Sequence, residues 1–140
     1  MDFLNQYFKY DNNTTICGLT ASLASFYVAK LFENKKKNII ILTSTLYEAN
    51  QLFSNIKNYE ENTFLFPMDD FLTSVALAIS PELKNTRIET LEHLKKDRGI
   101  IITNLTGYLK FLPDYKVQDK LNITLCKGQT INRTKLIELL

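Results

Sequence analysis

Short apolar runs alternate with amphipathic stretches over most of this chain of 140 residues. Residues 39–42 and 100–103 consist largely of isoleucine, leucine and threonine, which is typical of strands buried on both faces of a sheet. Residues 14–17 and Thr63–Phe66 are two further short runs, and Pro67 marks the end of the latter. The sequence therefore predicts four strands.

Helical patterns separate these runs. A stripe from Leu23 to Leu31, with apolar residues three and four positions apart, follows the first run. Thr45 and Glu48 have the spacing of a capping box, and Ser80 before Pro81 is typical of a helix start. Strands that alternate with helices predict an α/β fold, with a mostly parallel sheet and helices on both faces.

The pattern changes near the C-terminus. Residues 122–126 alternate polar and apolar side chains, which predicts the opening strand of a second module. Lys127 and Gly128 are typical of a turn, and a helix is predicted from Asn132. We therefore assign residues 1–115 to a first domain and residues 116–140 to the start of a second, α+β module. The last helix reaches Leu140 without a glycine or polar cap, so we expect this module to be truncated.

Composition restricts the function only weakly. There are 17 basic and 15 acidic residues, and a net charge of +2 neither indicates nor excludes nucleic-acid binding. Cys17 and Cys126 lie in apolar runs, which predicts reduced, buried thiols. The apolar runs are too short to span a membrane and no secretory signal is present, so we expect a cytoplasmic protein without membrane contacts.

The turn after the first run aligns with the phosphate-binding motif G-x-x-x-x-G-K-[ST]. Its residues are Gly18, Thr20, Leu23, Ala24 and Ser25. Gly18 and Ser25 match the motif, but Leu23 replaces the glycine that lets the backbone approach phosphate, and Ala24 replaces the lysine that neutralises it. The loop is degenerate, and we predict no nucleotide site and no cofactor.

No other pattern predicts catalysis or a metal centre. The strand ends carry no paired acidic residues of the kind that hold magnesium in nucleotide hydrolases. His93 is the only histidine, Asp69 and Asp70 are more typical of a helix cap than of a metal site, and Arg87 is more typical of a structural ion pair. Two alternatives remain: a P-loop-like domain that binds or hydrolyses NTP through a non-standard loop, and a flavodoxin-like module that binds another small ligand.

The order of several motifs resembles the N-terminal region of the bacterial transcription-repair coupling factors, the Mfd family, whose first domains are similar to those of UvrB. The resemblance covers nearly the whole chain. It rests on the loop at Gly18 and Thr20, the segment from Ile39 through Tyr47, Ala49 and Leu52, Phe66-Pro67 with Asp69-Asp70, Ser80-Pro81-Glu82, Arg87-Ile88, Leu91, Leu94, residues 100–103, Leu112-Pro113, residues 123–125, Lys127-Gly128 and Asn132.

This resemblance implies a first domain built on an inactive nucleotide-binding fold and a second domain that docks on UvrA. Between Pro67 and Ser80 only Phe71 is aromatic, so the DNA-probing hairpin of UvrB is not expected. Family members bind RNA polymerase and translocate on DNA through later domains that this sequence lacks. The UvrA-contacting residues would follow Leu140, so we expect weak or absent UvrA binding and no enzymatic activity from these residues alone.

Overall fold

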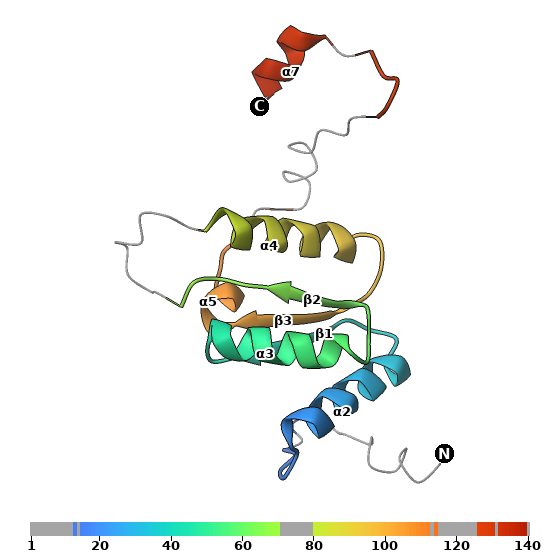
Figure 1. Cartoon of the computed structure of the whole chain (residues 1–140), viewed down its shortest axis with the longest axis vertical. Coiled ribbons are helices and arrows are strands. Elements are labelled where there is room, and N and C mark those ends of the chain that lie inside the picture. Colours follow the sequence, from blue (N-terminus) through green and yellow to red (C-terminus); the bar gives the residue numbers. More distant parts are fainter. Residues whose placement is uncertain are drawn as a thin grey trace. The chain divides into compact units, whose positions relative to one another are not determined.

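The computed structural model describes residues 13, 15–70, 80–112, 114, 126–130 and 132–139. The chain divides into two compact units, Met1–Leu109 and Lys110–Leu140. The first unit contains the sheet and most of the helices (Figure 1). The proposed domain boundary between residues 115 and 116 stays a prediction.

The sheet of the first unit is parallel, as predicted. Its described strands are β1 (Ile39–Thr43), β2 (Thr63–Phe66) and β3 (Ile100–Asn104), in the order β1-β3-β2. All five residues of β3 are buried, because this strand lies between the other two and both of its faces are covered. The three runs with the strongest apolar character therefore form the strands that they predict.

The fourth predicted strand, at residues 14–17, is wrong. Residues 15–17 lie outside the sheet and are exposed, and Thr14 is outside the described residues. Gly18 follows immediately with a φ of 80°, a left-handed conformation that turns the chain away from an extended path. The described residues of this run, which lead directly into that turn, therefore do not join the sheet.

Both cysteines are free but exposed, so the prediction that they are buried is also wrong. Cys17 belongs to the exposed run before Gly18. Cys126 begins a turn in which its carbonyl accepts a hydrogen bond of 3.1 Å from the backbone N–H of Gln129. Apolar neighbours in the sequence therefore do not bury either thiol.

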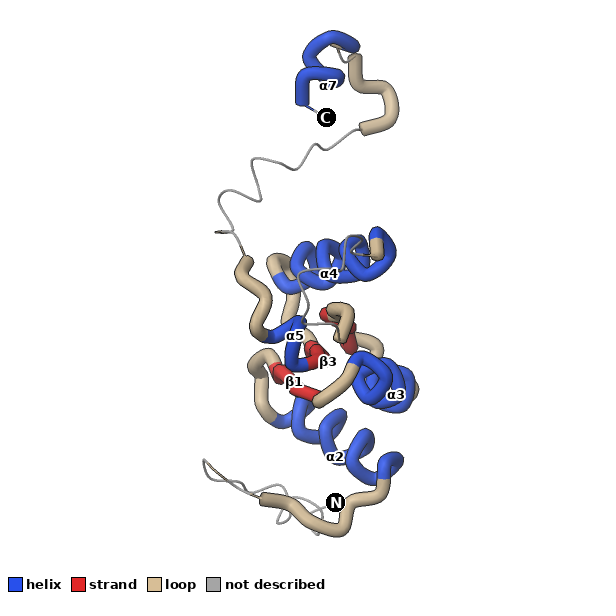
Figure 2. Tube along the Cα trace, turned by 90° about the vertical axis from the view of Figure 1, so that its left-hand side faces the viewer, coloured by secondary structure: helices blue, strands red, loops and turns tan. Residues whose placement is uncertain are grey.

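Helices cover both faces of the sheet (Figure 2). The helices α2 (Ala21–Asn34) and α3 (Leu46–Lys57) pack on one face, and α4 (Pro81–Leu94) packs against β2 on the other. The core between sheet, α2 and α3 is a cluster of buried apolar side chains, namely Phe32, Ala49, Ile56, Leu65, Ile100 and Ile102. The predicted α/β fold is confirmed.

The start of α3 uses the predicted capping box. The hydroxyl of Thr45 accepts a 3.2 Å hydrogen bond from the N–H of Glu48. The Glu48 carboxylate accepts a 3.0 Å hydrogen bond from the N–H of Ser44, one residue before the cap. One free N–H of the first helical turn, and one N–H just before the cap, are thereby satisfied.

The second unit contains α7 (Arg133–Leu139), which begins as the sequence predicts. The side-chain oxygen of Asn132 accepts a 2.9 Å hydrogen bond from the N–H of Thr134, which is a helix-capping contact. Lys127 and Gly128 form the predicted turn. The strand predicted before it falls mostly on residues 122–125, which lie outside the described residues.

No helix in the described part of the chain is long and apolar enough to cross a membrane.

Gly107 provides a test of this packing. It belongs to the short helix α5 (Leu105–Tyr108) after β3, and a Cβ at this position would lie 2.5 Å from the Thr103 hydroxyl and 2.9 Å from the Phe66 carbonyl oxygen. Because neither atom is the end of a flexible chain, we expect Gly107→Ala to destabilise the protein by about 1–3 kcal/mol in urea unfolding. Tyr108→Ala, at an exposed neighbour, is the control, and equal stabilities of the two variants would contradict this packing.

Candidate functional site

The carboxyl ends of the strands carry a connected set of polar groups. This is the edge at which parallel α/β sheets usually bind ligands. The Thr43 hydroxyl, at the end of β1, donates to the Thr45 carbonyl at 2.9 Å and lies 3.3 Å from the Thr103 carbonyl. The Thr103 hydroxyl, on β3, donates to the Phe66 carbonyl of β2 at 2.8 Å. Side-chain hydroxyls therefore join the ends of all three strands.

Asn104 is the centre of this edge. Its side chain is fully buried, and its amide oxygen accepts a 3.1 Å hydrogen bond from the Met68 N–H. Its amide nitrogen lies 2.6 Å from the Met68 carbonyl, 2.7 Å from the Asp70 carboxylate and 2.8 Å from the Thr106 hydroxyl. The two amide hydrogens are shared among three acceptors, so the hydrogen-bonding capacity of this side chain is used within the protein.

Asp70 extends these contacts to the start of α3. Both of its carboxylate oxygens lie 2.9 Å from the backbone N–H of Leu46, the first residue of that helix. The start of a helix carries partial positive charge and free N–H groups, and it is a common binding place for phosphate. At α3 that place is taken by a carboxylate of the chain itself. The short helix that Asp69 and Asp70 are predicted to open would fall on residues 71–79, which lie outside the described residues. The helix whose start Asp70 contacts is α3, which precedes it in the chain.

Arg87 anchors the same segment from α4. Its guanidinium donates a 2.7 Å hydrogen bond to the Pro67 carbonyl and is 8% exposed. Burial lowers the pKa of Arg87, and the nearby negative charge of Asp69 partly offsets that effect. An arginine remains protonated at any physiological pH, so a positive charge lies beneath the segment, bonded to the Pro67 carbonyl. The structural role predicted for Arg87 fits this geometry.

The degenerate loop lies at the start of α2. Gly18 is exposed, a Cβ added there would meet no atom within 4 Å, and Thr20 precedes the helix without a side-chain capping bond. Ala24 donates its backbone N–H to the Thr20 carbonyl at 2.8 Å, and Leu23 is exposed. Ser25, at the position of the metal-binding hydroxyl, is fully buried and donates to the Ala21 carbonyl at 2.9 Å.

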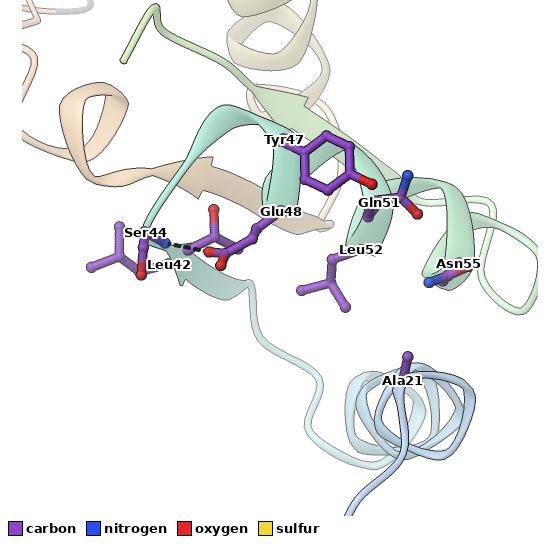
Figure 3. Close-up of a pocket in the computed structure, with 9 residues that line it drawn as sticks. Ala21, Leu42, Ser44, Tyr47, Glu48, Gln51, Leu52 and Asn55 are labelled. Carbon is purple, nitrogen blue, oxygen red and sulfur yellow. Dashed lines mark hydrogen bonds between the residues drawn. The ribbon is translucent and has the colours of Figure 1, made fainter. Parts of the chain in front are cut away.

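A pocket of about 440 Å³ lies beside this helix start (Figure 3). Tyr47, Gln51 and Asn55 lie on successive turns of α3 and form one wall, and Ala21 of α2 lies across from them (Figure 3). The remaining lining residues are Leu42, Thr43, Ser44, Glu48 and Leu52. Among these described lining residues only Tyr47 and Glu48 are ionisable, so the lining has no cation to balance a phosphate group.

His93 is separate from this edge. Its ring stacks on Phe64 of β2, with centroids 4.0 Å apart, and its Nε2 atom is buried without a hydrogen-bond partner in the described residues. No group of three or more histidine, cysteine or acidic side chains in those residues is placed to hold a metal ion.

Sequence reasoning missed Asn104. The one available signal was that a polar residue stands at the end of a fully buried strand.

The fold and this site define the chain as an α/β domain with a parallel sheet and a strand-end edge occupied by its own side chains. No protein-family model matches it. It is similar to curated proteins named transcription-repair-coupling factor, with 28% identity over 132 residues of the one from Staphylococcus aureus strain USA300, which is 92% of this chain and 11% of the relative. The relatives from Staphylococcus haemolyticus and Staphylococcus epidermidis are 28% and 27% identical over 123 residues, 86% of this chain and 10% of each relative.

The resemblance that the sequence motifs indicate is therefore confirmed by these relatives. The chain spans about a tenth of the length of the curated relatives it matches.

The contacts of Asn104 predict a large stability effect. Asn104→Leu keeps the side-chain volume similar but leaves the N–H and C=O groups of Met68 without a partner and removes one donor to the Asp70 carboxylate, so we expect a loss of about 2 kcal/mol or more in the free energy of unfolding. The same change at the exposed Asn85 of α4 is the control and should cost much less. Equal losses in urea denaturation would show that these hydrogen bonds contribute nothing.

Proposed function

We propose that this chain is a non-catalytic part of a transcription-repair coupling factor that contributes to UvrA recruitment and to autoregulation in transcription-coupled nucleotide excision repair. The single observation that carries the non-catalytic assignment is the start of α2, where Ala24 replaces the phosphate-binding lysine and the Ser25 hydroxyl is buried in a helical hydrogen bond. The names of the relatives support the repair assignment.

The charges at the strand-end edge support this proposal. A nucleoside triphosphate carries several negative charges that a binding site must neutralise with lysine, arginine or magnesium. The pocket beside α2 is lined by Glu48 and no cation, and the start of α3 is occupied by Asp70. The Arg87 guanidinium donates its hydrogen bond to the Pro67 backbone carbonyl. We therefore propose that this fold, which resembles nucleotide-binding domains, serves to bind other proteins of a cytoplasmic assembly and does not bind a nucleotide.

The partners follow from the family resemblance. We propose that UvrA binding requires the complete second domain, of which residues 116–140 supply the beginning. Contacts with DNA and RNA polymerase would be made by other domains of the full-length protein. The rival function is an NTP-binding or NTP-hydrolysing domain with a non-standard loop, and no contact in the described residues favours it.

Titration with magnesium and labelled ATP separates the two functions. We expect no saturable binding and no phosphate release by a highly purified sample, because no ammonium group stands at position 24. Ser25→Ala should behave like the unaltered chain. Micromolar affinity that disappears in Ser25→Ala would overturn the non-catalytic assignment.

Capture on immobilised UvrA tests recruitment. We expect weak or absent retention of residues 1–140 and clear retention of the same chain extended through its natural downstream sequence. The downstream segment without residues 1–115 is the control for a contribution of the first domain. If the extended chain also fails to bind UvrA, the recruitment proposal is wrong, whatever the result with ATP.

A further inference from the structure

The two outer edges of the sheet, on β2 and β1, differ in whether their outward backbone groups are hydrogen-bonded. On β2 the Leu65 carbonyl accepts a 2.7 Å hydrogen bond from the Thr90 hydroxyl of α4, and the Lys57 ammonium of α3 lies 3.5 Å from the Thr63 carbonyl. Thr63 is 0% exposed and Leu65 9%. Side chains from the flanking helices therefore close this edge against another strand, as natural sheets commonly do.

The outer edge of β1 pairs with no other strand among the described residues. The Ile39 N–H donates to the Gly99 carbonyl of the neighbouring strand segment at 3.1 Å. Alternate residues of a parallel strand bond to the same neighbour, so the backbone groups of Ile40 and Leu42 face away from β3. No side chain in the described part of the chain bonds to these groups, and Ile40 is 62% and Leu42 48% exposed.

We propose that this edge pairs with β1 of a second copy of the chain, antiparallel and about a two-fold axis beside Ile41. Such an axis places Ile40 of one copy opposite Leu42 of the other, so the outward N–H and C=O groups of both residues find partners. The exposed Ile40 and Leu42 side chains then form one continuous apolar strip across a six-stranded sheet. This inference does not depend on the proposed function.

The distribution of charge favours a second copy of the chain as the partner and favours antiparallel pairing. Lys35, Lys36 and Lys37 precede β1, whereas Glu48, Asp69 and Asp70 lie at or near the carboxyl edge of the sheet. An antiparallel pair brings the basic end of each copy toward the acidic end of the other, and a parallel pair would bring like charges together. Residues 38–44 contain no charged residue and no proline, the residues that usually prevent pairing at an edge.

Light scattering during size-exclusion chromatography of a dilution series tests the proposal. We expect a mass of twice 16.2 kDa for the unaltered chain at high concentration, and 16.2 kDa for Ile40→Lys. The control is Ile88→Lys, which changes an isoleucine of α4 that is 40% exposed and should leave the dimer intact. A monomer at every concentration, or a dimer that persists in Ile40→Lys, would overturn the proposal.

Hydrogen exchange of the unaltered chain supplies a test that needs no variant. The amides of Ile40 and Leu42 should exchange slowly at high concentration and quickly on dilution, whereas the Ile41 amide, which faces β3, should be protected at both. Slow exchange of Ile40 and Leu42 in a monomer would show that another segment of the same chain covers the edge, and would also overturn the proposal.

Discussion

The buried amide of Asn104 holds the carboxyl edge of the sheet together. One side chain at the end of β3 bonds to the backbone of Met68, to Thr106 and to Asp70, and Asp70 in turn caps α3. A buried amide without partners costs far more than a satisfied one gains, so these contacts are formed together or the edge opens. This amide ties the segment after β2, at Met68 and Asp70, to the end of β3, and through Asp70 to the start of α3.

The same contacts give this edge its chemical character. In a nucleotide-binding relative of the fold, the strand ends and helix starts would offer cations and free N–H groups to phosphate. Here the strongest such position is filled by the Asp70 carboxylate, and the neighbouring pocket is lined by Glu48. The proposal that the chain is a non-catalytic part of a transcription-repair coupling factor is argued from this occupied edge, and the relatives that suggest the repair process match the chain over a tenth of their own length.

The sequence predicts those parts of the fold that depend on local patterns. Apolar runs located β1, β2 and β3, and the spacing of Thr45 and Glu48 located the start of α3. The fourth strand was wrong because a short β-prone run forms a strand only if a neighbour pairs with it, and that neighbour is not encoded locally. The departures from the phosphate-binding motif at Leu23 and Ala24 are visible in the sequence itself. The contacts that join Asn104 to Met68, Asp70 to Leu46 and Arg87 to Pro67 each span 20 or more residues and leave no periodic signal.

Amide hydrogen exchange at Leu46 and Met68 tests the closed edge most directly. Both N–H groups donate to side chains of the Asn104 and Asp70 pair rather than to helix or strand partners. We predict that both exchange as slowly as the core amides of β3 and that magnesium with ATP leaves their rates unchanged. Fast exchange at both positions, or protection that rises when nucleotide is added, would contradict the account.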